Sequence, residues 1–132
     1  MIIHFTRDSV CMGDDMMDNS RDYELSDDAV WTDILKVVKE KHFLPHVSGN
    51  DVVWVLMNNN GNEIFALYVL KDVVVRISPK DTVKQICQDS NTLHFRYYIS
   101  PKERGQWLLG LYKGDMYSMW RDGVMEEYKY CQ

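Results

Sequence analysis

The 132-residue sequence predicts a single α+β domain in which a mixed sheet packs on one long helix. Three observations predict this fold: alternating apolar residues at 2–7, an amphipathic segment that begins near Ser26, and β-branched and aromatic runs from Asp51 onward. A period of two is typical of a strand, and apolar spacings of three and four are typical of a helix. A chain of this length buries roughly two-thirds of its unfolded surface, which is enough for one core.

The first 25 residues predict two strands of a loosely connected hairpin. Residues 2–7 alternate between apolar and polar side chains, and residues 23–25 have an extended pattern. Between them, Gly13 admits a positive φ and the neighbouring aspartates can bond their own backbone, which favours a turn.

The next segment predicts the long helix. Ser26 can accept a hydrogen bond from the first free amides, and Asp27 and Asp28 face the positive end of the helix dipole. Because the residue before a proline avoids the helical region, we expect Pro45 to end the helix. One apolar stripe faces the core, formed by Trp31, Ile34, Leu35 and Val38.

The middle of the chain predicts three strands. The apolar runs at residues 52–57 and 63–70 flank an asparagine-rich turn that contains Asn60-Gly61, a strong hairpin signal. Residues 73–77 form the third run. Since these runs are almost continuously apolar, we expect one face of the sheet to be largely covered and the other face partly covered.

The last part predicts a short helix, a strand and a helical extension. Asp81 opens the short helix, which passes through Val83, Ile86 and Cys87, and residues 92–99 alternate as a strand. Ser100-Pro101-Lys102-Glu103 is a capping box, so a helix is expected to start there. A further apolar face follows, with Met116, Met119 and Trp120. Residues 1–99 are therefore the expected core, and residues 100–132 the extension packed on it.

This order of elements resembles the β-grasp arrangement of ubiquitin-like domains, in which a sheet wraps one helix lying across it. The resemblance covers residues 1–99. The opening, Ile3-His4-Phe5-Thr6-Arg7-Asp8-Ser9-Val10-Cys11-Met12-Gly13-Asp14-Asp15, also looks like the start of small uncharacterised bacterial proteins that have no assigned activity. The chain ends Tyr130-Cys131-Gln132 and lacks the terminal Gly-Gly of conjugated ubiquitin-like proteins.

The net charge of −5 is unevenly distributed. Residues 1–33 hold nine acidic residues against two arginines, a local charge of −7, and the rest of the chain carries +2. This acidic segment favours basic partners and repels nucleic-acid phosphates. Acidic residues also collect on ordinary loops and helix starts, so the alternative is a solvated surface without a partner.

The remaining composition indicates the cellular setting. No apolar run approaches the roughly 18 residues that a membrane-spanning helix needs, and no signal sequence is evident. The three cysteines, Cys11, Cys87 and Cys131, are widely spaced, which is typical of reduced thiols. We therefore expect a cytoplasmic protein that binds neither membrane nor nucleic acid.

Sites for chemistry are weakly indicated. Asp14, Asp15, Asp18 and Asp22 cluster oxygen ligands, but their spacing fails the EF-hand pattern. His42 and His46 have the spacing of two zinc ligands on a helix, yet Pro45 would break that helix. Cys11, with His4 close by, is the best candidate nucleophile, although neighbouring carboxylates disfavour its thiolate. Phosphate-binding and nucleophile-elbow motifs are absent from the sequence.

The sequence thus predicts a small intracellular interaction module without catalysis or cofactor, such as an acidic inhibitor or an immunity-type partner, in the form of a monomer or a homodimer. The alternative is a cysteine- and histidine-based enzyme or a metal-binding protein. Methionine and aromatic side chains are frequent in interface cores, so a second, apolar surface is also a candidate. The expected protein-binding residues are Asp14, Asp15, Asp18, Asp22, Met116, Met119 and Trp120.

Overall fold

The chain has an α+β fold, as the sequence predicts. The computed structural model describes residues 1–9, 19–45, 52–68, 73–98 and 127–129. Two short helices separate groups of two, three and two strands in these parts. The elements are β1 (Ile2–Arg7), β2 (Arg21–Glu24), α2 (Trp31–Glu40), β3 (Val53–Asn58), β4 (Glu63–Tyr68), β5 (Val73–Arg76), α3 (Val83–Cys87), β6 (Thr92–Tyr98) and β7 (Glu127–Lys129).

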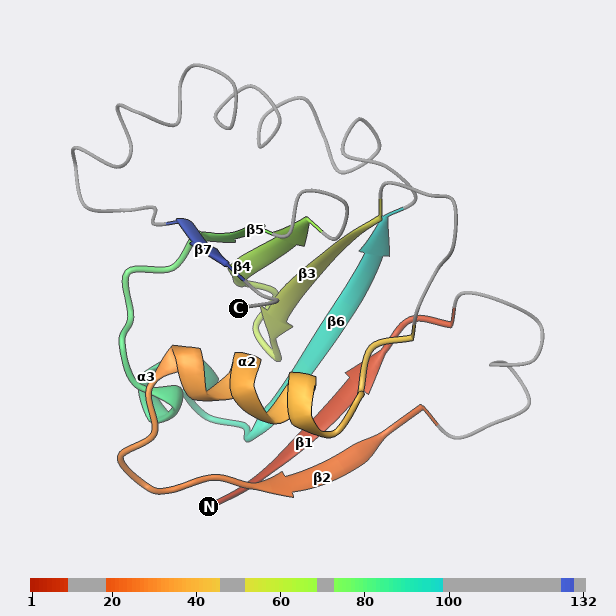
Figure 1. Ribbon diagram of the computed structural model, residues 1–132. Coiled ribbons are helices and arrows are strands. Elements are labelled where there is room, and N and C mark those ends of the chain that lie inside the picture. The colour runs from red at the N-terminus through yellow and green to blue at the C-terminus, as the bar shows by residue number, and fades with distance from the viewer. Residues whose placement is uncertain (10–18, 46–51, 69–72, 99–126, 130–132) are drawn as a thin grey trace.

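The strands form one mixed seven-stranded sheet in the order β2-β1-β6-β3-β4-β5-β7. β1 and β6 are parallel, with Thr6 opposite His94, and every other neighbouring pair is antiparallel. Helix α2 lies across one face of this sheet, and α3 lies beside the amino-terminal end of α2 (Figure 1). β2 and β7 are the two edges.

The long helix begins later and ends earlier than the sequence predicts. α2 has ten residues and starts at Trp31 rather than near Ser26. The residues just before it pair with another segment: Val30 forms a bridge with Thr82, and the Ala29 carbonyl accepts from the Val83 N–H at 2.9 Å. Backbone held in that pairing cannot join the helix. Asp33 then caps the start by accepting from the Val30 N–H at 2.9 Å.

The end of α2 is set before Pro45. The helix ends at Glu40, and His42 adopts a left-handed φ of 52°. This turn directs Phe43 back into the core, where it is 7% exposed. The apolar stripe itself is confirmed: Trp31, Ile34 and Val38 are buried, and Leu35 is partly buried against the same core.

The predicted hairpin between β3 and β4 is confirmed. The Asn58 side-chain oxygen accepts from the Asn60 and Asn62 N–H groups at 3.0 and 2.9 Å, and Gly61 has a φ of +82°. The Asn58 amide group also donates to the Ile86 carbonyl at 2.9 Å, which ties the turn to α3. One buried side chain thus organises the turn and anchors it.

The predicted short helix is confirmed as α3, with Thr82 rather than Asp81 as its N-cap. The Thr82 hydroxyl accepts from the Gln85 N–H at 3.2 Å, and the Gln85 side chain accepts from the Thr82 N–H at 3.3 Å. This reciprocal pair is a capping box.

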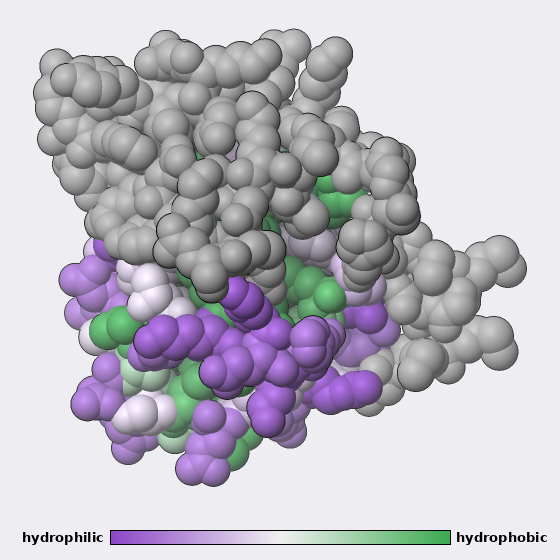
Figure 2. Space-filling view, in the orientation of Figure 1, coloured by the Kyte–Doolittle hydropathy of each residue, from purple (hydrophilic) through white to green (hydrophobic). Residues whose placement is uncertain are grey.

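The main core lies between the sheet and the helices. Phe5, Phe65 and Phe95 are fully buried there and contact one another or Phe43 at ring distances near 6 Å. Trp31 of α2 packs on Phe65, with ring centroids 5.9 Å apart. On the solvent side of α2, hydrophilic side chains dominate the coloured surface (Figure 2).

The opposite face of the sheet carries a second buried apolar cluster. Its members lie on β3, β4 and β5, and each is at most 2% exposed. The expectation that the second face is partly covered therefore agrees with the structure. The cluster consists of Val53, Val55, Ala66, Tyr68 and Val75.

The carboxyl-terminal part differs from the sequence prediction where it is described. Residues 127–129 form strand β7, paired antiparallel with β5, instead of belonging to a helical extension. Pairing with an exposed sheet edge satisfies their backbone groups, a long-range effect that helical periodicity does not report. The helices expected from Ser100 and around Met116 lie outside the described residues.

Candidate functional site

We call the face of the sheet that lies opposite α2 the outer face. On β2, β1 and β6 this face carries polar side chains that are exposed or half-buried, and we call this set the polar half. The β1 burial pattern turns Ile3 and Phe5 toward the helix. His4 and Thr6 therefore point to the outer face, where neighbouring strands add the other groups. The polar half includes His4, Thr6, Asp22, Glu24 and His94, with Asp8 at the end of β1, and the exposed Ile2 of β1 lies on the same face.

His94 is held through both of its ring nitrogens. Its Nε2 lies 2.7 Å from the Asp8 carboxylate, and its Nδ1 lies 2.6 Å from the Thr6 hydroxyl. A carboxylate only accepts, so His94 Nε2 carries a proton and donates it to Asp8, and His94 Nδ1 shares a hydrogen bond with the Thr6 hydroxyl. The second Asp8 oxygen accepts from the Tyr97 N–H at 2.9 Å. These contacts join the end of β1 to β6.

His4 makes a second contact between an imidazole and a carboxylate. Its Nδ1 lies 2.5 Å from Asp22 Oδ1, across the antiparallel β1–β2 pair. Both side chains face solvent, with exposed fractions of 44% and 62%. An ion pair so exposed contributes little to stability. Asp22 therefore remains a surface carboxylate at the edge of the sheet.

The order of hydroxyl, imidazole and carboxylate in Thr6, His94 and Asp8 is the order that activates a nucleophile. A catalytic site also needs a place for substrate and donors for a developing oxyanion. One pocket in the described part of the chain has a volume of about 360 Å³. It is lined by residues other than Thr6, His94 and Asp8, among them Asn58, Ile77 and Lys80. Whatever their chemistry, these three side chains clasp the end of β1 to β6.

The cysteine that the structure describes is protected. Cys87 is 2% exposed, and burial raises the pKa of its thiol to about 11. Cys87 thus packs as a buried small hydrophobic residue of α3. Cys11, the candidate nucleophile, and Cys131 lie outside the described residues.

The structure describes few of the predicted binding residues. Asp22 is one of them and lies exposed on the edge strand β2. His42 is exposed after α2, whereas His46 is not described. Among the described side chains, three or more His, Cys, Asp or Glu residues nowhere converge as metal ligands. The predicted residues outside the described part are Asp14, Asp15, Asp18, Met116, Met119 and Trp120.

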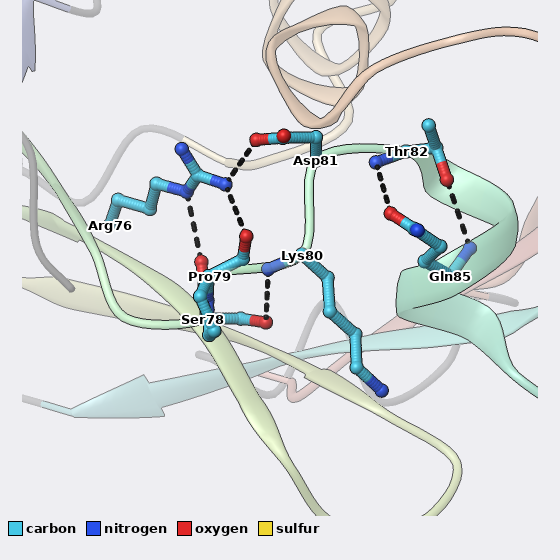
Figure 3. A network of polar contacts seen from close by, with 7 residues as sticks. All are labelled: Arg76, Ser78, Pro79, Lys80, Asp81, Thr82 and Gln85. Carbon is cyan, nitrogen blue, oxygen red and sulfur yellow. Dashed lines mark hydrogen bonds and ion pairs between the residues drawn. The ribbon is translucent and has the colours of Figure 1, made fainter. Parts of the chain in front are cut away.

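A buried polar network near β5 was not predicted from the sequence. Arg76 is 7% exposed; it donates to the Ser78 and Pro79 carbonyls at 2.9 and 3.0 Å and pairs with Asp81 at 2.6 Å (Figure 3). Its guanidinium also lies 5.2 Å from the centre of the Trp31 ring. The sequence signal that could have indicated this network is the charge of Arg76 next to the apolar residues of β5. The network fixes the loop between β5 and α3, and its groups are used within the protein.

Comparisons with protein-family models, curated proteins and solved structures found no match. Within the described part of the chain, no helix combines the length and the apolar character needed to cross a membrane. What the polar half can do therefore follows from its own geometry.

Proposed function

We propose that the chain is a non-catalytic protein-interaction module with a β-grasp-like core, acting in the cytoplasm on a basic protein partner. The support for a β-grasp arrangement is the element order of two strands, helix and further strands. The first and last strands of that core, β1 and β6, lie parallel at the centre of the order β2-β1-β6-β3-β4. The shortness of α2 is a departure from the one long helix of the resemblance.

The observation that carries the proposal is a contrast between engaged and exposed groups. His94, Arg76 and Cys87 are each held by neighbours or buried, so their chemistry is used for the fold. Asp22 and Glu24, by contrast, are exposed on the edge strand β2, where the contact of Asp22 with His4 is itself open to solvent. Exposed carboxylates within the acidic segment, residues 1–33, favour a basic partner through a field that salt screens over about 10 Å.

The experiment is affinity capture with a matched pair of variants. Asp18→Asn with Asp22→Asn removes two negative charges from the acidic segment. Glu40→Gln with Asp89→Asn removes two from exposed positions elsewhere. We expect the first variant to retain at least tenfold less of a captured basic protein, and the second to behave as the unchanged chain. Equal capture by both variants would remove the acidic segment as the contact.

A histidine-based enzyme is the second candidate, because Thr6, His94 and Asp8 have the order of a hydroxyl nucleophile, its base and an orienting carboxylate. Hydrolysis of an activated acetate ester, such as p-nitrophenyl acetate, separates the two functions. Non-catalytic binding predicts equal rates for the unchanged chain and for His94→Gln. A rate that falls at least 100-fold in the variant would favour the enzyme.

A further inference from the structure

Among the described strands, β2 lies at an open edge of the sheet. It pairs with β1 on one side and ends the strand order on the other (Figure 1). Met1 and Leu25 are the next pair after Ile2 and Glu24 in the antiparallel β1–β2 register. They exchange two backbone hydrogen bonds of 2.8 and 2.9 Å. In an antiparallel pair such bonded positions alternate with unbonded ones. Tyr23 therefore bonds toward β1, whereas the backbone N–H and C=O groups of Asp22 and Glu24 point away from the sheet.

The side chains of β2 present two chemistries to anything placed along this edge. Asp22 and Glu24 pair with His4 and Ile2, so their carboxylates lie on the outer face. Tyr23 lies on the helix face, where its ring is 5.6 Å from that of Phe5 and 6.1 Å from that of Phe43. The edge thus presents an acidic, an aromatic and an acidic side chain at three consecutive residues.

A second copy of the same strand fits this edge poorly. Residues that oppose each other in an antiparallel pair point to the same face, so two copies of β2 can centre their pairing only on Asp22 or on Tyr23. The first register places Asp22 opposite Asp22 of the second copy. The other places Asp22 opposite Glu24 of the second copy, twice. Like charges directly opposite each other are destabilising, so the strand disfavours self-pairing while its backbone stays open.

We propose that the β2 edge binds an extended basic peptide segment by antiparallel strand addition. The segment places a lysine or arginine opposite Asp22, an apolar residue opposite Tyr23, and a second lysine or arginine opposite Glu24. Main-chain hydrogen bonds hold such a strand, and alternate side chains select it. This inference rests on the proposed function, because it names the partner's chemistry and how the module holds it.

The probe is a blocked seven-residue peptide with Lys-Val-Lys at its centre. Binding is followed by backbone amide NMR of the full chain and by fluorescence anisotropy. We expect the amide shifts to concentrate at Asp22 and Glu24. Shifts confined to other strands would overturn the proposal.

Two N-methylated peptides of unchanged charge separate strand addition from simple charge attraction. In the proposed register the lysine N–H groups donate to the Asp22 and Glu24 carbonyls, and the valine N–H points away. Methylating both lysine nitrogens should weaken binding at least tenfold, and methylating the valine nitrogen less than threefold. Equal binding of the two methylated peptides would overturn strand addition.

Variants of the chain complete the test. The double variant Asp22→Lys, Glu24→Lys should bind the unmodified peptide at least tenfold more weakly than the unchanged chain does. The double variant Glu40→Lys, Asp89→Lys has the same change of charge and should weaken that binding less than threefold. Equal effects would overturn the proposal. Amide spectra of both variants check that the fold is retained. If the peptide does not bind while affinity capture still depends on the acidic segment, only the proposal of strand addition is wrong. Failure of the capture instead removes the proposed function.

Discussion

The outer face of the sheet has two halves that share one backbone pattern and differ in side chains. Over β3, β4 and β5 it carries Val53, Val55 and Ala66, which are fully buried. Over β2, β1 and β6 it carries the polar half, in which His4 and His94 keep exposed fractions of 44% and 38%. The boundary runs between β6 and β3, where Met57 stands opposite His94.

This difference separates the half of the face that stabilises the fold from the half that stays in contact with solvent. The apolar half gains stability by leaving water, roughly 25 cal/mol for each Å² of apolar surface. The polar half meets its hydrogen-bonding needs through cross-strand contacts, so it stays in solvent without a cost. A partner can therefore reach the polar half and its β2 edge without disturbing the core.

Matched substitutions at one residue in each half test the contrast most strongly. Val55→Asn places an unpaired amide at a fully buried position and should lower the free energy of unfolding by about 3 kcal/mol or more. Ile2→Asn, at a position 53% exposed on the same face, should lower it by less than about 1 kcal/mol. Urea denaturation measures both. Equal losses would mean that the two halves are not different environments.

The thiol of Cys87 extends the contrast to reactivity. In a Cys11→Ser, Cys131→Ser background, Cys87 should react with a thiol reagent at pH 8 at least about 100-fold more slowly than in the unfolded chain, because burial raises the pKa of its thiol from 9.0 to about 11. Since the folded pKa lies above the unfolded one, stability should fall as pH rises from 9.0 toward 11. Labelling at the unfolded rate would show that the core is open at this position.

The two aspartates of the polar half should differ in their structural contribution. Asp8→Ala removes the acceptor for both the His94 ring and the Tyr97 N–H, and we expect a loss of about 2 kcal/mol. Asp22→Ala removes one exposed contact and should cost less than about 1 kcal/mol. Thermal unfolding of both variants provides the measurement. A larger loss from Asp22→Ala would assign Asp22 to the fold instead of to binding.

Charge reversal on the edge strand has the smallest expected effect. Glu24→Lys turns the register centred on Tyr23 from repulsive to attractive, since each new lysine then faces Asp22 of a second copy. Each such pair contributes roughly 0.2–1 kcal/mol, so sedimentation should detect weak dimers of this variant at high concentration. The unchanged chain should remain monomeric under the same conditions. Dimers of the unchanged chain that form through β2 would contradict the self-pairing argument.

Local patterns in the sequence were enough to predict most of the secondary structure. The hairpin around Asn60-Gly61, the α3 segment and the alternating strand at residues 92–98 follow from turn chemistry, capping and period. The start of α2 did not follow, because the bridge between Val30 and Thr82 joins residues 52 positions apart. Strand β7 also depends on a distant partner, β5.

The candidate site was less predictable than the fold. Asp22 was named for its charge, but its position on an edge strand depends on the sheet order. The contact between Asp8 and His94 joins residues 86 apart, and the parallel β1–β6 pair that creates it has no local signal. Arg76 stood out only as a charge in an apolar run.

The most direct test of the open β2 edge is amide hydrogen exchange of the free chain, residue by residue, along residues 21–24. The account predicts slow exchange at Arg21 and Tyr23, whose N–H groups bond toward β1. It predicts exchange at least tenfold faster at Asp22 and Glu24. Protection at Asp22 and Glu24 equal to that at Tyr23 would mean that the edge is already covered, and would contradict the account.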